Sequence, residues 1–409
     1  MHITTNSGNT YSYIRRTNEI VSGLVEEQGY EWNFAPLSVF SAISEVAMFI
    51  IGITEQCNMR CTYCCYSGSY KHNRTHSYKA LNSQDIDEIY DFILRIKTKK
   101  PTHIAFYGGE PLLQYALIQY AVERGSDRLG GDVAYSITTN GTMLTPVKMD
   151  WLFAHNIEIV ISLDGTKSFH DKYRVFPNGS GSFAQVHNVL SYILVHYPHY
   201  RHLVSLQMTF PSYKDVEKIA EEWQKNSVLR EYVPRNIHGL AANFSQEVKI
   251  LYYEEVRTFY NHLIDVYEKH QEWAVLRVLL EECISSWKER PILDAGNMIP
   301  MSTCLPVNTK LYIDAKKEIG VCEKIADKYR IGNVKDGLDW GKANALAREY
   351  YNRRFDRCKF CPAVRMCELC LTAIEYTPKQ WDVLCHNERV YARVFMYVFC
   401  EMAERGLIK

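Results

Sequence analysis

The sequence has no excess of charge of either sign. Its 409 residues include 47 Lys and Arg against 47 Asp and Glu, so the formal net charge is zero. A neutral chain creates no overall field that would draw it to nucleic acid or to an anionic membrane. We therefore expect neither kind of partner.

Long apolar runs are also missing. The stretch from Leu37 to Ile53 is interrupted by serines and by Glu45, which makes it too polar to span a bilayer. Residues 1–12 lack the charged region and apolar core of a secretory signal. The sequence therefore predicts a cytoplasmic protein without a transmembrane helix.

Internal repeats and low-complexity tracts are absent, and hydrophobic residues make up 47% of the chain, as in an ordinary globular protein. Against this background the thirteen cysteines are conspicuous. Disulfides are disfavoured in a reducing compartment, where clustered thiols more often bind metal or carry out redox chemistry. The cysteines are therefore the first place to look for function.

Strand-like and helix-like segments alternate from residue 47 onward. Predicted strands are 47–54, 102–107, 133–138, 157–163, 203–210 and 236–242, and predicted helices are 83–96, 112–124, 183–195 and 216–225. Six strands with helical crossovers predict an α/β fold in which a parallel sheet curls into a partial (β/α)6, TIM-like barrel. The active site of such a barrel forms on the loops that follow the strands.

The sequence divides into four predicted parts. Residues 1–46 form an N-terminal extension with a β-hairpin or helix, and residues 47–247 form the barrel. Residues 248–300 form a helical connector. Residues 301–409 form a small C-terminal domain of a hairpin plus helices, ending in an amphipathic helix.

Three cysteines follow the first predicted strand directly. Cys57, Cys61 and Cys64 are separated by three and then two residues. Soft thiolates suit iron–sulfur clusters, and three of them on one short loop can bind three irons of a cubane, leaving the fourth iron open. Zinc or buried free thiols are the alternatives. The side chain of the adjacent Cys65 is expected to point in the wrong direction to bind the same cubane, so we expect it to have a packing role.

This spacing resembles the hallmark of the radical SAM superfamily, in which a [4Fe–4S] cluster binds S-adenosyl-L-methionine (SAM). Motifs at other predicted strand ends extend the resemblance, and it implies a cofactor-binding role for each. These residues are Tyr63 at the adenine, Gly108, Gly109, Glu110 and Pro111 at the methionyl amino group, Asn140 in a weaker match, and Ser162 with Asp164 at the ribose. All of these residues fall at predicted strand ends, where the barrel requires them.

Seven further cysteines lie between residues 304 and 385, and their spacing permits zinc as readily as iron–sulfur. Their order resembles the SPASM domain, a C-terminal iron–sulfur extension of radical SAM enzymes that modify peptides and proteins. The resemblance implies two auxiliary iron–sulfur clusters of the [4Fe–4S] type. Cys304, Cys322 and Cys370 would bind the inner cluster, and Cys358, Cys361, Cys367 and Cys385 the outer one.

The inner set lacks a fourth cysteine soon after Cys304, so either one iron is open to a substrate thiolate or a distant residue completes the site. Cys283 is the candidate for that residue. In its helical run, however, a buried cysteine acting as a small hydrophobe is more common, and Cys400 has the same character.

Glu323 follows Cys322 immediately. In sulfatase-maturating relatives an aspartate at the corresponding position is proposed to remove a proton from the substrate, so the resemblance suggests Glu323 as a catalytic base. An ion pair at the surface is the alternative.

The resemblance implies a maturase for a ribosomally made precursor peptide. A 5′-deoxyadenosyl radical would take hydrogen from the peptide, leading to a thioether, carbon–carbon or ether cross-link, with flavodoxin or ferredoxin as electron donor. Formylglycine formation in a sulfatase is a second enzymatic interpretation. A non-catalytic iron–sulfur electron carrier or peptide scaffold is a third, although such a protein has no use for the loop from Gly108 to Pro111. The leader peptide would add a strand to the N-terminal hairpin or bind a separate protein.

Overall fold

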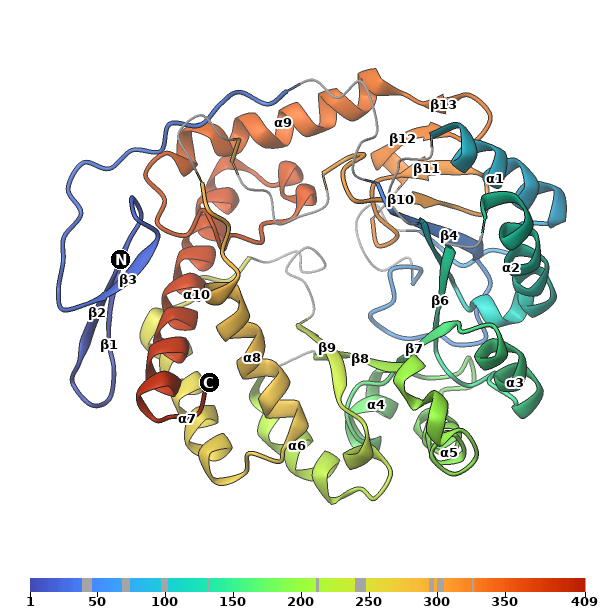
Figure 1. Cartoon of the computed structure of the whole chain (residues 1–409), viewed down its shortest axis with the longest axis horizontal. Coiled ribbons are helices and arrows are strands. Elements are labelled where there is room, and N and C mark those ends of the chain that lie inside the picture. The colour runs from blue at the N-terminus through green and yellow to red at the C-terminus, as the bar shows by residue number, and fades with distance from the viewer. Residues whose placement is uncertain are drawn as a thin grey trace. The chain divides into compact units, whose positions relative to one another are not determined.

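The computed structural model describes residues 1–38, 46–67, 74–96, 102–130, 133–210, 213–239, 248–293, 298–299, 305–325 and 327–408 (Figure 1). The chain forms two compact units. One consists of Met1–Ser38, Ala241–Thr303 and Ala347–Lys409, and the other of Val39–Leu240 and Cys304–Leu346. Each unit is described by itself.

The second unit is built on parallel strands that lie in the sheet in the order of the sequence. They are β4 (Met48–Thr54), β5 (Thr102–Gly108), β6 (Val133–Thr139), β7 (Glu158–Ser162), β8 (Val204–Phe210) and β9 (Pro234–Gly239). Many of their apolar side chains have no exposed surface, as at Ile51, Ile104 and Ile159, which is typical of parallel strands covered on both faces. The predicted parallel sheet is confirmed, with strand ends within a few residues of the expected positions.

Helices connect these strands. They are α1 (Ser83–Ile96), α2 (Tyr115–Leu129), α3 (Pro146–Ala154), α4 (Lys167–Tyr173), α5 (Phe183–His196) and α6 (Val216–Lys225), and in Figure 1 α1, α2, α3 and α5 lie along one side of the strands. The helix predicted over 112–124 begins later, because Pro111–Gln114 forms a 3₁₀ turn first. Further 3₁₀ turns are Pro198–Leu203, Tyr213–Asp215 and Leu229–Glu231.

A second group of strands extends the same sheet beyond β4. Strand β10 (Lys310–Ile313) pairs with β4 in parallel, and β11 (Glu318–Gly320), β12 (Arg330–Asn333) and β13 (Gly337–Leu338) follow in antiparallel order. A short 3₁₀ turn, Asp327–Tyr329, precedes β12. This pairing covers the β4 edge, whose backbone groups would otherwise be open. The predicted hairpin therefore belongs to the barrel sheet, and a boundary near residue 300 does not separate it.

The first unit combines a small antiparallel sheet with long helices. Its strands are β1 (His2–Thr4), β2 (Thr10–Ile14) and β3 (Glu19–Ser22), and its helices are α7 (Tyr253–Lys269), α8 (Ala274–Lys288), the last part of α9 (Trp340–Cys358) and α10 (Pro378–Glu404), with a 3₁₀ turn at Leu371–Glu375. Helix α10 begins at Pro378 because Thr377 caps it there. No helix within the described ranges is long and apolar enough to cross a membrane.

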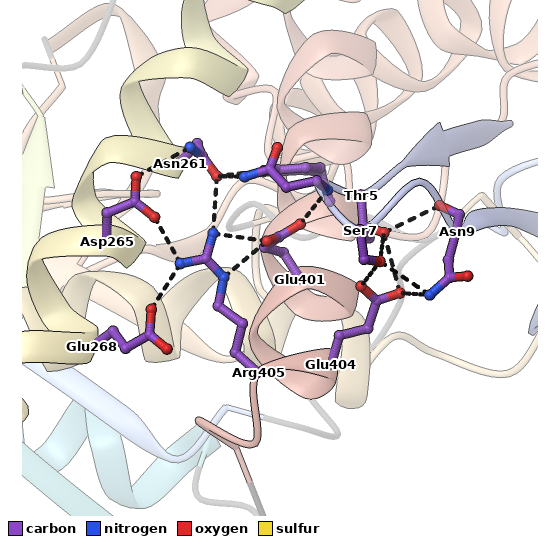
Figure 2. A network of polar contacts seen from close by, with 11 residues as sticks. Thr5, Ser7, Asn9, Asn261, Asp265, Glu268, Glu401, Glu404 and Arg405 are labelled. Carbon is purple, nitrogen blue, oxygen red and sulfur yellow. Dashed lines mark hydrogen bonds and ion pairs between the residues drawn. The ribbon is translucent and has the colours of Figure 1, made fainter.

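A polar network fixes the N-terminal sheet to these helices (Figure 2). Arg405, just after α10, donates to Asp265 at 2.7 Å and to Glu268 at 3.0 Å, both on α7. Glu404 accepts hydrogen bonds from the turn between β1 and β2, at 2.6 Å from Ser7 and 3.0 Å from Asn9. The N-terminal extension is therefore an integral part of its unit.

Candidate functional site at the ends of the barrel strands

The first cysteine group forms a compact loop after β4. The Cys64 amide donates to the Cys61 carbonyl at 3.1 Å, and backbone N–H groups lie 3.4 Å from the Cys57 sulfur and 3.3 Å from the Cys64 sulfur. None of the described cysteines forms a disulfide. N–H groups directed at sulfur stabilise thiolates and the clusters they bind.

The three thiols lie close to one another. The pKa of Cys57 is raised to about 12, mainly by burial, with smaller contributions from Glu110 and from the neighbouring Cys61 and Cys64 thiols. Burial likewise raises the pKa of Cys61 to about 11, although Arg174 opposes the shift. A bound metal removes such protons outright. Within the described ranges no group of three His, Cys, Asp or Glu side chains is arranged so that it could hold a single metal ion. This does not exclude a four-iron cluster, because each ligand of such a cluster contacts a different iron.

The loop after β5 packs directly on the chain that enters this cysteine loop. The Gly109 amide donates to the Thr54 carbonyl at 2.9 Å, and the Glu110 amide to the Gln56 carbonyl at 2.7 Å. A Cβ at Gly108, whose φ is 138°, would lie 2.2 Å from the Thr54 oxygen. Only glycine allows this approach. The two glycines therefore allow the loop after β5 to pack against the segment that leads into the cysteine loop.

Glu110 connects two neighbouring strand ends. It is fully buried, and its carboxylate accepts from the Leu112 amide at 3.0 Å, the Thr139 hydroxyl at 2.8 Å and the Asn140 amide at 2.8 Å. Burial raises the pKa of Glu110, and these hydrogen bonds oppose the shift. Pro111 begins the 3₁₀ turn that Glu110 caps. Binding of the SAM amino group by Glu110 stays a prediction, and the structure adds a positioning role.

Asn140 continues this connection to the cysteine loop. Its amide nitrogen donates to Asn58 at 2.8 Å, and its oxygen accepts from the Thr142 amide at 2.9 Å. Asn58 in turn donates to the Thr142 hydroxyl at 2.9 Å. The weaker motif around Asn140 thus has a clear structural place beside Cys57.

An ion pair between the buried Asp164 and the half-buried Arg174 lies on the opposite side of the cysteine loop. Asp164, 2% exposed, pairs with Arg174 at 2.8 Å, accepts a hydrogen bond from the Tyr63 hydroxyl and accepts another from the Thr209 amide at 3.1 Å. Burial lowers the pKa of Arg174, but Asp164, Tyr63 and Cys61 together raise it well above its ordinary value. Ser162 lies half-buried at the end of β7.

Two more amides of the cysteine loop donate to the backbone of residues 173–175, at 2.7 and 2.9 Å. Arg174 lies 5.4 Å from the centre of the Tyr63 ring. Sequence reasoning missed Arg174, because nothing in its local pattern distinguishes it from a surface arginine.

Cys322 and Glu323 follow the β10–β11 hairpin in the same unit. Glu323 is buried and pairs with Lys310 at 2.9 Å. Burial would raise the pKa of Glu323, but Lys310 and Lys324 hold it below its ordinary value. Arg74 donates to the Glu323 carbonyl at 3.0 Å. Glu323 is therefore a buried, charged carboxylate instead of a surface ion-pairing group.

Cys65, for which we predicted packing, is half-buried beside Cys64. Its thiol interacts electrostatically with Arg74 and with Glu323. It therefore lies on the side of the cysteine loop that faces the hairpin.

The outer cysteines come together in the first unit. Cys358 ends α9, Cys361 and Cys367 lie in the loop that follows, and Cys385 is on α10. Burial raises the pKa of Cys385 to about 11, with further contributions from Cys358 and Cys361. Cys358 also raises the pKa of Cys361 and of Cys367, after the larger effect of burial. Four thiols that influence one another electrostatically fit a cluster site.

The N-terminal extension supports this cysteine loop. The Trp32 amide donates to the Lys359 carbonyl at 2.8 Å, and the Trp32 indole to the Cys361 carbonyl at 3.2 Å. Trp32 and Phe34 pack in one apolar cluster with Cys358. In the sequence, only the aromatic residues between 30 and 34 indicated that this segment packs against another part of the chain. They did not indicate that the partner is the loop of Cys361.

The predicted inner site is only partly visible. Cys370 begins a 3₁₀ turn in the first unit and accepts from the Thr372 hydroxyl at 3.3 Å, Cys322 belongs to the second unit, and Cys304 lies outside the described residues. Their common site stays a prediction. Cys283 and Cys400 are buried in α8 and α10, in agreement with packing roles.

Residues 51–223 match the radical SAM superfamily. The chain is 31% identical over 149 residues to the cysteine-type anaerobic sulfatase-maturating enzyme of Clostridium novyi, covering 35% of this chain and 39% of that protein. It is 28% identical over 130 residues to the radical SAM cyclopropyl synthase TigE of Paramaledivibacter caminithermalis, covering 29% of this chain and 27% of that protein. The matches thus span less than half of these relatives.

Solved structures share the fold. Native anSMEcpe with bound AdoMet and Cp18Cys peptide superposes with a TM-score of 0.65 at 16% identity, covering 89% of this chain and 99% of that one. Streptococcus suis SuiB bound to precursor peptide SuiA gives 0.53 at 14% identity, covering 82% and 74%. The predicted radical SAM fold and the relation to sulfatase-maturating enzymes are confirmed, and the family implies SAM and a [4Fe–4S] cluster.

Proposed function

We propose that this radical SAM enzyme is a maturase that modifies a ribosomally made precursor peptide. The observation that carries the proposal is the cysteine loop 57–64, hydrogen-bonded on one side to the Gly109 loop and on the other to residues 173–175. A loop held between several strand ends gives a cofactor a fixed position, as the active site of such a barrel requires.

Cys57, Cys61 and Cys64 would bind the cluster, and the loop that begins at Gly108 would bind SAM with Tyr63, Asn140, Ser162 and Asp164. When bound, these groups supply a 5′-deoxyadenosyl radical that abstracts hydrogen. The role of the chain is to orient the cluster, SAM and the substrate and to exclude water. Glu110 keeps two strand ends together, and the pair of Asp164 with Arg174 holds Tyr63.

Auxiliary clusters would use the later cysteines, with an outer site at Cys358, Cys361, Cys367 and Cys385 and an inner one at Cys304, Cys322 and Cys370. The electrostatic interaction among the outer thiols supports the first assignment. We propose Glu323 as the base that takes a proton from the peptide, since Lys310 keeps its buried carboxylate charged.

The names of the relatives support a peptide substrate. One matures sulfatases, and SuiB was solved with its precursor peptide. The product would be a thioether, carbon–carbon or ether cross-link, and flavodoxin or ferredoxin would supply the electron. Formylglycine formation is the second candidate, and the 31% identity to the Clostridium novyi enzyme favours it.

The test uses the full chain reconstituted with iron and sulfide without oxygen. Reduced protein and SAM are incubated with the precursor peptide encoded beside the gene, or with a sulfatase-motif peptide, and products are analysed by mass spectrometry. We expect 5′-deoxyadenosine and loss of two hydrogens from the precursor alone. Cys61→Ala is the inactive control. A change in the sulfatase peptide alone favours the second candidate, and fully loaded protein that forms no 5′-deoxyadenosine contradicts both.

A further inference from the structure

Arg354 is a buried cation without a carboxylate partner in the described part of the chain. It lies on α9 one turn before Cys358 and is 1% exposed. Its Nη1 donates to the Tyr350 hydroxyl at 3.4 Å, and its Nη2 has no hydrogen-bond partner among the described residues. Such a guanidinium is expensive to bury unless an anion lies beside it.

The groups that face Arg354 are cysteine sulfurs. Residues four apart on a helix share a face, so Arg354 is directed toward Cys358, with whose side chain it interacts electrostatically. It also interacts electrostatically with Cys367. Glu388 is close enough for a weak interaction with Arg354 but forms no ion pair with it among the described contacts. The sulfurs of two predicted ligands of the outer cluster, Cys358 and Cys367, therefore lie beside this cation.

We propose that Arg354 is the counter-charge of the outer auxiliary cluster and raises its reduction potential. The inference rests on the proposed cluster at Cys358, Cys361, Cys367 and Cys385. One added electron makes a cluster more negative by one unit, so a fixed positive charge stabilises the reduced form more than the oxidised form. Hydrogen bonds to ligand sulfurs and local net charge are established determinants of such potentials. Arg354 acts here as a positioning and tuning residue, with no bond of its own made or broken.

The neighbouring Arg353 offers a matched control. It is on the same helix, its side chain is 36% exposed, and it pairs with Glu349 at 3.2 Å. Water and a carboxylate already compensate its charge. Removal of Arg353 should therefore leave a cluster at Cys358 unaffected.

The experiment compares reconstituted wild-type protein with Arg354→Met, Arg354→Lys and Arg353→Met. Each is titrated with dithionite and followed by electron paramagnetic resonance, and iron content is measured in parallel. We expect Arg354→Met to lower the potential of one auxiliary cluster by at least 59 mV, a tenfold change in a one-electron equilibrium. Arg354→Lys should give a smaller decrease. Arg353→Met and the SAM-binding cluster should be unchanged.

The other outcomes are also decisive. An unchanged auxiliary potential in loaded Arg354→Met protein overturns the inference, and so does loss of that cluster from both Met and Lys variants, which indicates a role in packing alone. Loss from the Met variant with retention in the Lys variant supports the counter-charge. Wild-type protein that takes up no more iron than one cluster contradicts the proposed auxiliary site itself, and peptide modification measured on the same sample tests the proposed function separately.

Discussion

Gly109 and Gln56 lie so close together that a Cβ on Gly109 would be 2.1 Å from the Gln56 carbonyl oxygen. Gln56 directly precedes the first cysteine of the loop. The contact therefore joins the two segments that the radical SAM motifs mark as cluster-binding and SAM-binding, and a change in one segment displaces the other.

Substitution Gly109→Ala should lower SAM cleavage by about a hundredfold, because displacement of a reacting group by about 1 Å has an effect of this size. The measurement is 5′-deoxyadenosine formation per cluster, with SAM binding as a second readout. Gly341→Ala is the control, since its Cβ would approach only one side-chain oxygen, at 3.2 Å. Equal activity of Gly109→Ala and wild type would show that the close approach is not required.

Substitution Asp164→Asn should destabilise the barrel unit by about 3–5 kcal/mol, because it leaves Arg174, whose side chain is only 11% exposed, without its counter-charge. Urea unfolding measures the change. The control Glu221→Gln removes an exposed pair with Lys225 and should change stability by less than about 0.5 kcal/mol. Similar effects of the two variants would contradict a buried pair of this strength.

Stability should fall on acidification because of His170. Burial lowers its pKa to about 4, and its Nδ1 accepts a hydrogen bond from the Asp164 amide at 3.2 Å, which requires the neutral ring. In the unfolded chain the pKa of this histidine is about 6.5, so below that pH the unfolded chain binds a proton that the folded chain does not bind. The free energy of unfolding should therefore fall by up to about 3 kcal/mol between pH 6.5 and 4. Unfolding measured against pH should have a shallower slope in His170→Gln, and an unchanged slope would refute this assignment.

Substitution Glu323→Gln should separate SAM cleavage from peptide modification. If Glu323 takes a proton from the peptide, 5′-deoxyadenosine still forms while modified peptide falls by about 10²–10⁴-fold. Both products are measured in the same reaction. Glu318→Gln, on the same hairpin, should leave both rates near wild type, and equal loss of both products in Glu323→Gln would indicate a structural role.

Substitution Cys367→Ser should remove about four irons per chain, since this thiol is a proposed ligand of a four-iron cluster. Cys283→Ala should leave iron content unchanged, because that thiol is buried in α8 and donates to the Leu279 carbonyl at 3.4 Å. Iron analysis after anaerobic reconstitution distinguishes them. Retention of all iron in Cys367→Ser would exclude it as a ligand.

Local patterns in the sequence were sufficient for the strands of the barrel, for the bounds of α1 and α6 and for the cysteine loop 57–64. Hydrophobic periodicity, helix ends and short ligand spacings each depend on residues close together in the chain, so they can be read without a partner. The same is true of the glycines at 108 and 109. Their motif identified them from the sequence, although the close backbone contacts that require glycine were visible only in the structure.

Only the tertiary structure decided which distant residues meet. The pairing of β10 with β4 made the predicted C-terminal hairpin part of the barrel sheet, Arg174 was found as the partner of Asp164, and Trp32 was found against the loop of Cys361. Each of these contacts depends on how the chain returns on itself, and a single sequence carries no local signal of that path. The spacing of the cysteines thus predicted the chemistry, while long-range packing determined which side chains surround the predicted ligands.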